Sequence, residues 1–133
     1  MQTEPVYDDV VREVCAELAQ TASTLVASGV RAERISLDPG FGFGKTLAHN
    51  YELLKHLNQV VALGHPVFVG MSRKSMVGAV TGRSLEQRTT GSVAAALMAV
   101  MAGARIVRVH DVASTLDAMA VWQAVQFGPE IKK

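Results

Sequence analysis

The sequence predicts an α/β protein with the element order αβαβαβα, forming part of a (β/α)8 barrel. Helical stretches with one apolar side alternate with short apolar strands, which indicates a parallel sheet covered by helices. The residues at the strand ends, Asp38, Ser72 and His110, follow one another at intervals of 34 and 38 residues. Eight such units make a barrel of about 250 residues, so these 133 residues hold part of one. An open flavodoxin-like sheet is the alternative, but three strands are few for it.

The first half of the chain contains two predicted helices and one predicted strand. From Asp8 onwards apolar residues recur with helical spacing, and Gly29 supplies the end of this helix. Residues 35–37, Ile-Ser-Leu, form a short β-type run that a proline turn breaks at once. A second helix is predicted over 50–63 and ends at Gly64.

The second half contains two predicted strands and two predicted helices. Residues 67–69 are wholly apolar, and the third strand is predicted over 106–109. Between them, Ser84-Leu-Glu-Gln87 fits the capping-box pattern and predicts a third helix running to about residue 102. Asp111 is placed to cap a last helix, which stops near Gly128.

The composition indicates one globular domain over residues 1–133. Hydrophobic residues make up 49% of the chain and charged residues 19%, and the net charge is only +1. No single-sign field therefore attracts nucleic acid or a membrane surface, and 5% aromatic residues are too few for base stacking. The longest apolar stretch, 93–104, is well short of the ~20 residues of a membrane span. We expect no nucleic-acid partner and no membrane partner.

The single cysteine and the first residues indicate a cytoplasmic location. Cys15 has no second cysteine with which to form an internal disulfide, and it lies on the apolar stripe of a helix, where we expect it to pack in the core. Residues Met1–Pro5 have neither the basic start nor the apolar run of a signal peptide.

All three predicted strands end in polar, ionisable residues. Asp38 closes the first, Arg73 and Lys74 follow the second, and Arg108 and His110 lie at the end of the third. Ligands of parallel α/β proteins bind outside the carboxyl ends of the strands. The sequence therefore predicts a ligand site at this rim.

Asp38 and the glycine-rich segment after it favour a flat heterocycle as the ligand. The carboxylate of Asp38 could accept paired N–H donors from a ring, although aspartate is also common in turns. Residues 40–46, Gly-Phe-Gly-Phe-Gly-Lys-Thr, are not a phosphate-binding P-loop. That motif has four residues between its first glycine and the Gly-Lys pair, and here there are only three. They are not a dinucleotide fingerprint either, because Lys45 stands where the last glycine belongs. The glycines would let the backbone approach a flat ligand, with Phe41 or Phe43 available to stack; a flexible loop is the alternative.

The cations at the other two strand ends suit anionic or carbonyl groups of a ligand. Lys74 could bond a ring carbonyl and Arg73 a carboxylate, although such neighbours are often a solvated surface pair. Arg108 and His110 are two residues apart on a strand and share a face. They suit a phosphate at the start of the last helix, with a structural ion pair to Asp111 as the alternative.

Three segments resemble dihydropteroate synthase in order and spacing. They are Asp38-Pro-Gly-Phe-Gly-Phe-Gly-Lys45, Gly70-Met-Ser-Arg-Lys-Ser75 and Arg108-Val-His-Asp111, and the similarity runs from Met1 to about Phe127. The related pterin-binding methyltransferases lack the Ser-Arg-Lys turn of the second segment and the Arg-x-His ending of the third. The resemblance implies a TIM (β/α)8 barrel and a transferase of folate synthesis. Members join (7,8-dihydropterin-6-yl)methyl diphosphate to 4-aminobenzoate, releasing diphosphate and forming 7,8-dihydropteroate.

By the matched motifs, the resemblance also implies roles for single residues. The pterin would contact four of them, Asp38, Phe43, Gly70 and Lys74. Ser72 and Arg73 would face the aminobenzoate.

The resemblance further implies that Arg108 and His110 bind the diphosphate and, with Lys74, are the catalytic residues. Mg²⁺ would share the charge of the diphosphate, with no metal ligand in this chain and the ligand residue in the other half of the enzyme. Full-length members are expected to be homodimers.

Members of this family are about twice as long as the chain, which the resemblance aligns with their C-terminal half. We therefore expect the 133 residues alone to be inactive. Two other functions stay open: a half-barrel that only binds or assembles, and a different barrel enzyme with a phosphorylated substrate.

Overall fold

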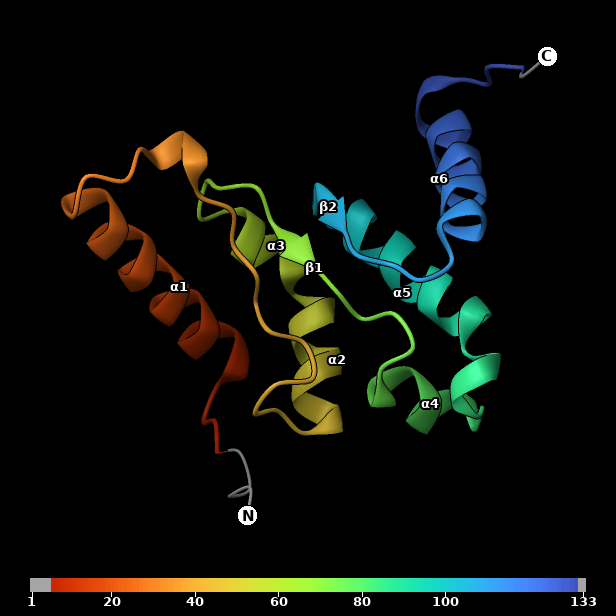
Figure 1. Ribbon diagram of the computed structural model, residues 1–133, viewed down its shortest axis with the longest axis horizontal. Coiled ribbons are helices and arrows are strands. Elements are labelled where there is room, and N and C mark those ends of the chain that lie inside the picture. The colour runs from red at the N-terminus through yellow and green to blue at the C-terminus, as the bar shows by residue number, and fades with distance from the viewer. Residues whose placement is uncertain (1–5, 132–133) are drawn as a thin grey trace.

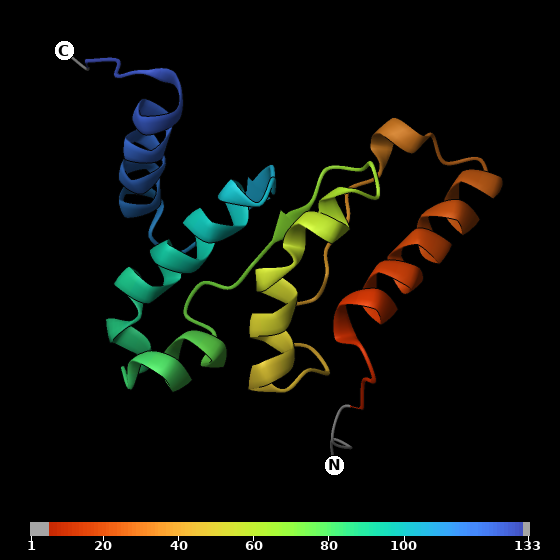
Figure 2. The same ribbon diagram turned by 180° about the vertical axis from the view of Figure 1, so that it is seen from behind.

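The computed structural model describes residues 6–131, so the expectation about Met1–Pro5 lies outside them. The α-helices are α1 (Val10–Ala27), α2 (Leu47–Lys55), α3 (Leu57–Val61), α4 (Ser75–Thr81), α5 (Thr89–Met101) and α6 (Val112–Phe127). The strands are β1 (Phe68–Val69) and β2 (Ile106–Val107), and the 3-10 turns are η1 (Ala32–Arg34) and η2 (Leu85–Gln87). Figures 1 and 2 show α1, α2, α5 and α6 following one another across the molecule, with the strands among them. The described residues thus hold six helices and two strands, where the sequence predicts four and three.

Helix α1 confirms the first predicted helix. The side chain of Asp9 caps it by accepting a hydrogen bond from the backbone N–H of Arg12, at 3.0 Å. Most of its apolar stripe is buried or partly buried, although Leu25 and Val26 near its end are exposed, and Cys15 packs partly buried beside this core as predicted. Burial first, and then the Asp9 carboxylate, raise the pKa of the Cys15 thiol.

The second predicted helix is divided in two at His56. It also begins earlier than predicted, because Thr46 and His49 form a reciprocal capping box. The N–H of His49 donates to the Thr46 hydroxyl and the N–H of Thr46 to the His49 imidazole, each at 3.1 Å. In the short helix α3, Leu57 and Val60 are completely buried. After the break at His56, α3 therefore directs both Leu57 and Val60 into the core.

The sheet is smaller than predicted but parallel as predicted. Phe68 pairs with Ile106 and Val69 with Val107. The predicted strand over 35–37 is reduced to one parallel bridge between Leu37 and Val67. The ladder ends there because Pro39 has no N–H to donate and the chain enters the glycine-rich turn.

The helix predicted from Ser84 begins instead at Thr89. The Ser84 hydroxyl lies 3.3 Å from the side chain of Gln87 and caps no helix, and residues 85–87 form only a 3-10 turn. Helix α4 was not predicted, because its glycine and short length give a weak helical pattern. It is held by tertiary packing, with Met76 and Val77 buried to 2% exposure.

Helix α6 begins after Asp111 as predicted, but the Asp111 side chain does not cap it. The core lies around β1, with its most buried large side chains being Phe41, Leu53, Leu57, Met76, Val60, Val67, Val69 and Val77. Only Thr115 of α6 is buried. Within residues 6–131, no helix is both long and apolar enough to cross a bilayer.

Candidate functional site

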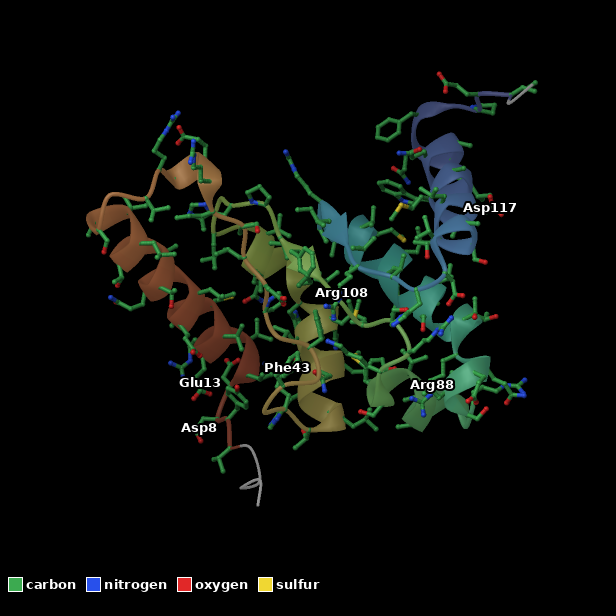
Figure 3. All side chains as sticks on the ribbon, in the orientation of Figure 1. Asp8, Glu13, Phe43, Arg88, Arg108 and Asp117 are labelled. Atoms are coloured by element: carbon green, nitrogen blue, oxygen red, sulfur yellow. The ribbon has the colours of Figure 1, made fainter. Side chains whose placement is uncertain are left out.

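The carboxyl ends of the three extended segments meet at one edge, as the sequence predicts. Leu37 is bridged to Val67 and β1 is paired with β2, all in parallel, so the residues after them emerge at the same rim. Hydrogen bonds then join the three ends to one another, as described below. Figure 3 shows Phe43 and Arg108 in the central part of the molecule, between α1 and α5.

The glycine-rich loop at this rim is held by side chains from several elements. Gly40, Gly42 and Gly44 have positive φ angles of 77°, 84° and 60°, which favour glycine. The ammonium of Lys45 donates to the backbone carbonyls of Gly40, at 2.9 Å, and Phe43, at 3.1 Å. Burial, as the largest cause, lowers the pKa of Lys45.

Two further contacts fix the loop from outside. The N–H of Gly42 donates to the side-chain oxygen of Asn50 at 2.9 Å, and Asn50 is only 4% exposed. The carboxylate of Asp38 is exposed and accepts the N–H of Gly40 at 2.9 Å. The loop is therefore held at several points by hydrogen bonds from within and outside it.

Phe41 and Phe43 behave differently. Phe41 is 1% exposed and belongs to the core, whereas Phe43 is 70% exposed beside the rim. Of the two aromatic residues considered for stacking, only Phe43 is available to a ligand. A pocket of about 290 Å³ lies between α1 and the loop, with Asp38, Phe43 and Lys45 in its lining. A larger pocket, of about 440 Å³, lies between α1 and Leu63, away from this rim.

Lys74 joins the turn after β1 to the glycine-rich loop. Its ammonium donates to the carbonyl of Phe41 at 2.7 Å and lies 4.9 Å from the centroid of the Phe43 ring. Burial first, and then the positive charge of Arg108, lower the pKa of Lys74, while Asp38 acts in the opposite sense. Asp38, Phe43, Lys74 and Arg108 thus form one cluster, which we call the rim cluster.

Arg73 diverges from Lys74. It has a φ of 59°, a left-handed conformation that costs a non-glycine residue about 1–3 kcal/mol. Its guanidinium pairs with Asp111 at 3.1 Å. The Arg73 guanidinium, chiefly through this hydrogen bond, lowers the pKa of Asp111.

Ser72 and His110 join the second strand end to the third. The Ser72 hydroxyl is 2.8 Å from Nδ1 of His110 and accepts the backbone N–H of His110 at 3.1 Å. Ser72 is 8% exposed and Gly70 is buried, while Arg108 and His110 are exposed. A methyl group at Gly70 would lie 3.4 Å from Nε of Arg108, so the arginine crosses the strand closely there. The ion pair considered between Asp111 and the Arg108–His110 pair is not formed, because Asp111 pairs with Arg73.

Residues 6–131 do not by themselves fit a Mg²⁺ ion. They contain no group of three or more His, Cys, Asp or Glu side chains that could hold a metal. Mg²⁺ prefers oxygen ligands in an octahedral arrangement. The carboxylates nearest the rim already bond other groups: Asp38 accepts from Gly40 and Asp111 pairs with Arg73.

Three residues that support the rim were not predicted: Asn50, Arg88 and Ser92. Asn50 holds the glycine-rich loop, and the other two bond the backbone of Arg73. All three bond backbone atoms distant in the sequence. The only signal in the sequence is that Asn50, a polar residue, lies at helical spacing from Leu53, Leu54 and Leu57; no motif indicates the contacts of Arg88 and Ser92.

Comparison with known proteins gives this rim a context. A family model described as pterin binding enzyme matches residues 1–110. Dihydropteroate synthase of Haemophilus influenzae is 49% identical over 124 residues, which cover 93% of this chain and 45% of that protein. The chain spans about half the length of the curated relatives it matches.

Solved structures agree in fold as well as in sequence. Dihydropteroate synthase from Xanthomonas albilineans in complex with 7,8-dihydropteroate matches with a TM-score of 0.92 and 50% identity, over 97% of this chain and 50% of that one. The same enzyme with 4-aminobenzoic acid matches with a TM-score of 0.92 and 51% identity, over 95% of this chain and 46% of that one. The fold is therefore a part of the dihydropteroate synthase barrel. The chain belongs to the pterin-binding enzyme family and is a homologue of dihydropteroate synthase that covers about half of the enzyme.

Proposed function

We propose that residues 1–133 form one side of the active site of a dihydropteroate synthase, as the C-terminal part of its barrel domain. The enzyme would condense (7,8-dihydropterin-6-yl)methyl diphosphate with 4-aminobenzoate to give 7,8-dihydropteroate and diphosphate. The observation that carries this proposal is the rim cluster: a carboxylate, an exposed aromatic ring and two cations from three different strand ends.

The rim cluster suits a pterin ring. The exposed carboxylate of Asp38 would accept paired N–H groups of the ring, and Phe43 offers an aromatic face. Lys74 has three donors, of which one bonds Phe41, so it could also donate to a ring oxygen or nitrogen. Gly70, whose lack of a side chain leaves room for the close approach of Arg108, would line the pterin pocket.

Arg108 and His110 would bind the diphosphate. Both are exposed and lie two residues apart in the segment between β2 and α6, because β2 ends at Val107 rather than at the predicted residue 109. The proposed reaction is dissociative: the C–O bond to diphosphate breaks first, and the leaving group takes the electron pair. The aniline nitrogen then forms the new C–N bond and loses a proton. Arg108 and His110 stabilise the charge of the leaving group, and Lys74 positions the ring.

Ser72 and Arg73 would contact the aminobenzoate. Both already have partners, His110 and Asp111, but Arg73 bonds Asp111 through Nη2 alone, so its other N–H groups could still bond a carboxylate. Mg²⁺ belongs to the proposal for the whole enzyme alone, and no step above depends on it.

Three further parts of the proposal concern the whole protein. The 133 residues alone would be inactive, because only one side of the site is made here. A homodimer of the full-length enzyme is supported by the apolar side chains that α6 exposes. A cytoplasmic location is supported by the single, partly buried Cys15, which has no disulfide partner.

A titration of the chain with a pterin diphosphate analogue tests the proposal. We expect binding that weakens about tenfold in Asp38→Asn and in Lys74→Met, because each loses a charge-assisted hydrogen bond. Asp117→Asn, an exposed carboxylate on α6, is the matched control and should bind as the wild type does. Absence of pterin binding would favour another phosphate-substrate enzyme. Normal dihydropteroate formation by the chain alone would contradict its predicted inactivity.

The binding or assembly module remains the second candidate, because α6 leaves apolar side chains exposed. Gel filtration separates the two: a module that closes by pairing should be a compact dimer at low concentration.

A further inference from the structure

Both backbone polar groups of Arg73 are held by side chains from the start of α5. Its N–H donates to the hydroxyl of Ser92 at 2.8 Å, and its carbonyl accepts from Nη1 of Arg88 at 2.9 Å. Arg88 and Ser92 are four residues apart, so their side chains lie on the same side of the helix. Ser92 is 3% exposed, and this contact is therefore shielded from water.

Arg88 reaches Arg73 through a space that a glycine leaves open. A methyl group at Gly78, in the middle of α4, would overlap the guanidinium of Arg88. Glycine inside a helix is unfavourable for the helix itself. Its presence here is explained by the close approach of Arg88, which also donates from Nε to the carbonyl of Arg83 at 3.2 Å.

The left-handed turn at Arg73 sends three consecutive side chains in three directions. Ser72 turns to His110, Arg73 to Asp111, and Lys74 to the carbonyl of Phe41. Arg73 is the only non-glycine residue with a positive φ among residues 6–131. An extended or helical conformation at this residue would redirect the side chains on either side of it.

We propose that Arg88 and Ser92 are positioning residues of the rim cluster, which hold Arg73 in its left-handed conformation and thereby aim Lys74 at the glycine-rich loop. Their bonds go to the backbone of Arg73 and Arg83, so they act through Arg73 rather than on a ligand. The effect on a pterin rests on the proposed function. The contacts of Arg88 and Ser92 with the backbone of Arg73, which we call the clamp, do not depend on the proposed function.

The carboxyl group of Asp111 reports where the Arg73 side chain lies. Its pKa is lowered chiefly by the hydrogen bond from Arg73, with smaller contributions in the same direction from Thr89 and His110, and it can be followed by carbon-13 NMR during a pH titration. Ser92→Ala and Gly78→Ala change no charge, and Arg88 is not among the groups that shift this pKa. In both variants we expect the pKa of Asp111 to rise towards its ordinary value. Ser92→Thr, which retains the hydroxyl, should restore the low pKa.

Ser23→Ala, on the exposed side of α1, is the matched control and should leave Asp111 unchanged. Urea unfolding of each variant establishes that it is folded. If Ser92→Ala does not fold, Gly78→Ala decides, because alanine is the better helix former. A folded variant in which Asp111 titrates as in the wild type overturns the clamp.

Titration with the pterin diphosphate analogue separates the clamp from the proposed function. We expect Ser92→Ala to bind about tenfold more weakly, the equivalent of one charge-assisted hydrogen bond from Lys74. A wild-type chain that binds no pterin, with Asp111 shifted in Ser92→Ala, leaves the clamp standing and overturns the function. If wild type and Ser92→Ala bind the pterin analogue equally and the pKa of Asp111 is unchanged, the clamp is overturned and the proposed function stands.

Discussion

Helices α3 and α6 differ in how much of each helix is buried. Helix α3 has five residues, and its Leu57 and Val60 are completely buried in the core cluster that also contains Val69 of β1. Helix α6 has 16 residues, of which only Thr115 is buried. The apolar side chains that α6 exposes are Val112, Leu116, Val121, Val125 and Phe127. The difference indicates that burial of apolar side chains in the core, rather than helix length, decides how much each helix contributes to stability.

The largest expected effect compares one leucine from each helix. Leu57→Ala should lower the free energy of unfolding by about 3 kcal/mol, because it leaves a cavity in the core. Leu116→Ala, at a side chain that is 58% exposed, should lower it by less than about 0.5 kcal/mol. Urea unfolding measures both. Equal losses would mean that α6 is covered in solution and that the comparison is wrong.

A smaller effect is expected at the one buried residue of α6. Thr115 donates from its hydroxyl to the carbonyl of Asp111 at 2.8 Å. Thr115→Val keeps the shape and removes this bond, so we expect a loss of about 1 kcal/mol in urea unfolding. Ser114→Ala, on the exposed side of the same turn, is the control. A larger loss in the control would show that the attachment of α6 lies elsewhere.

Phe43 sharpens the comparison because it is exposed like the side chains of α6 but lies in the rim cluster. Phe43→Ala removes the contact with Lys74, so the free energy of unfolding should fall by about 0.5 kcal/mol. Under the proposed function, the same change should weaken pterin binding about tenfold through the lost stacking. Val125→Ala, at 75% exposure on α6, should change neither quantity. Unchanged pterin binding in Phe43→Ala would remove this residue from the site.

The smallest effect concerns the ion pair that ties the start of α6 to the rim. Because the folded pKa of Asp111 is below its ordinary value of 3.8, the ionised carboxylate favours the folded state. This contribution is present above the ordinary pKa and is lost as the pH falls through the folded one. The stability difference between wild type and Asp111→Asn should therefore shrink on acidification, in urea titrations across this range. A constant difference would mean that the Arg73 pair contributes nothing.

Regular features of the fold could be predicted from the sequence. The apolar spacing from Asp8 indicates α1, and the three strand ends meet at one rim because parallel strands share an edge. The break at His56, helix α4 and the late start of α5 could not be predicted. These depend on packing between elements, such as that of α4 on α5 and α2 and of α3 on α1. They also depend on which of several possible capping residues starts a helix, which local patterns do not decide.

The same division applies to the candidate site. Asp38, Lys74 and Arg108 come together as the strand-end rule predicts. Arg88 and Ser92 are different: they bond backbone atoms 15 and 19 residues away, through a left-handed residue that no local pattern marks. Residues next to strand ends can be found from the chain order, whereas the residues that support them are found only in three dimensions.

The direction of the bond between Ser72 and His110 is linked to which ring nitrogen of the histidine can donate to a ligand. The Ser72 hydroxyl accepts the backbone N–H of His110, so its own hydrogen is free to be donated to Nδ1, 2.8 Å away. The neutral imidazole then carries its proton on Nε2, the nitrogen turned away from Ser72. In this tautomer His110 is a hydrogen-bond donor without a second ring proton. An anion at the rim would therefore meet an N–H donor on Nε2, and Ser72→Ala would remove the hydroxyl that holds the ring in this tautomer.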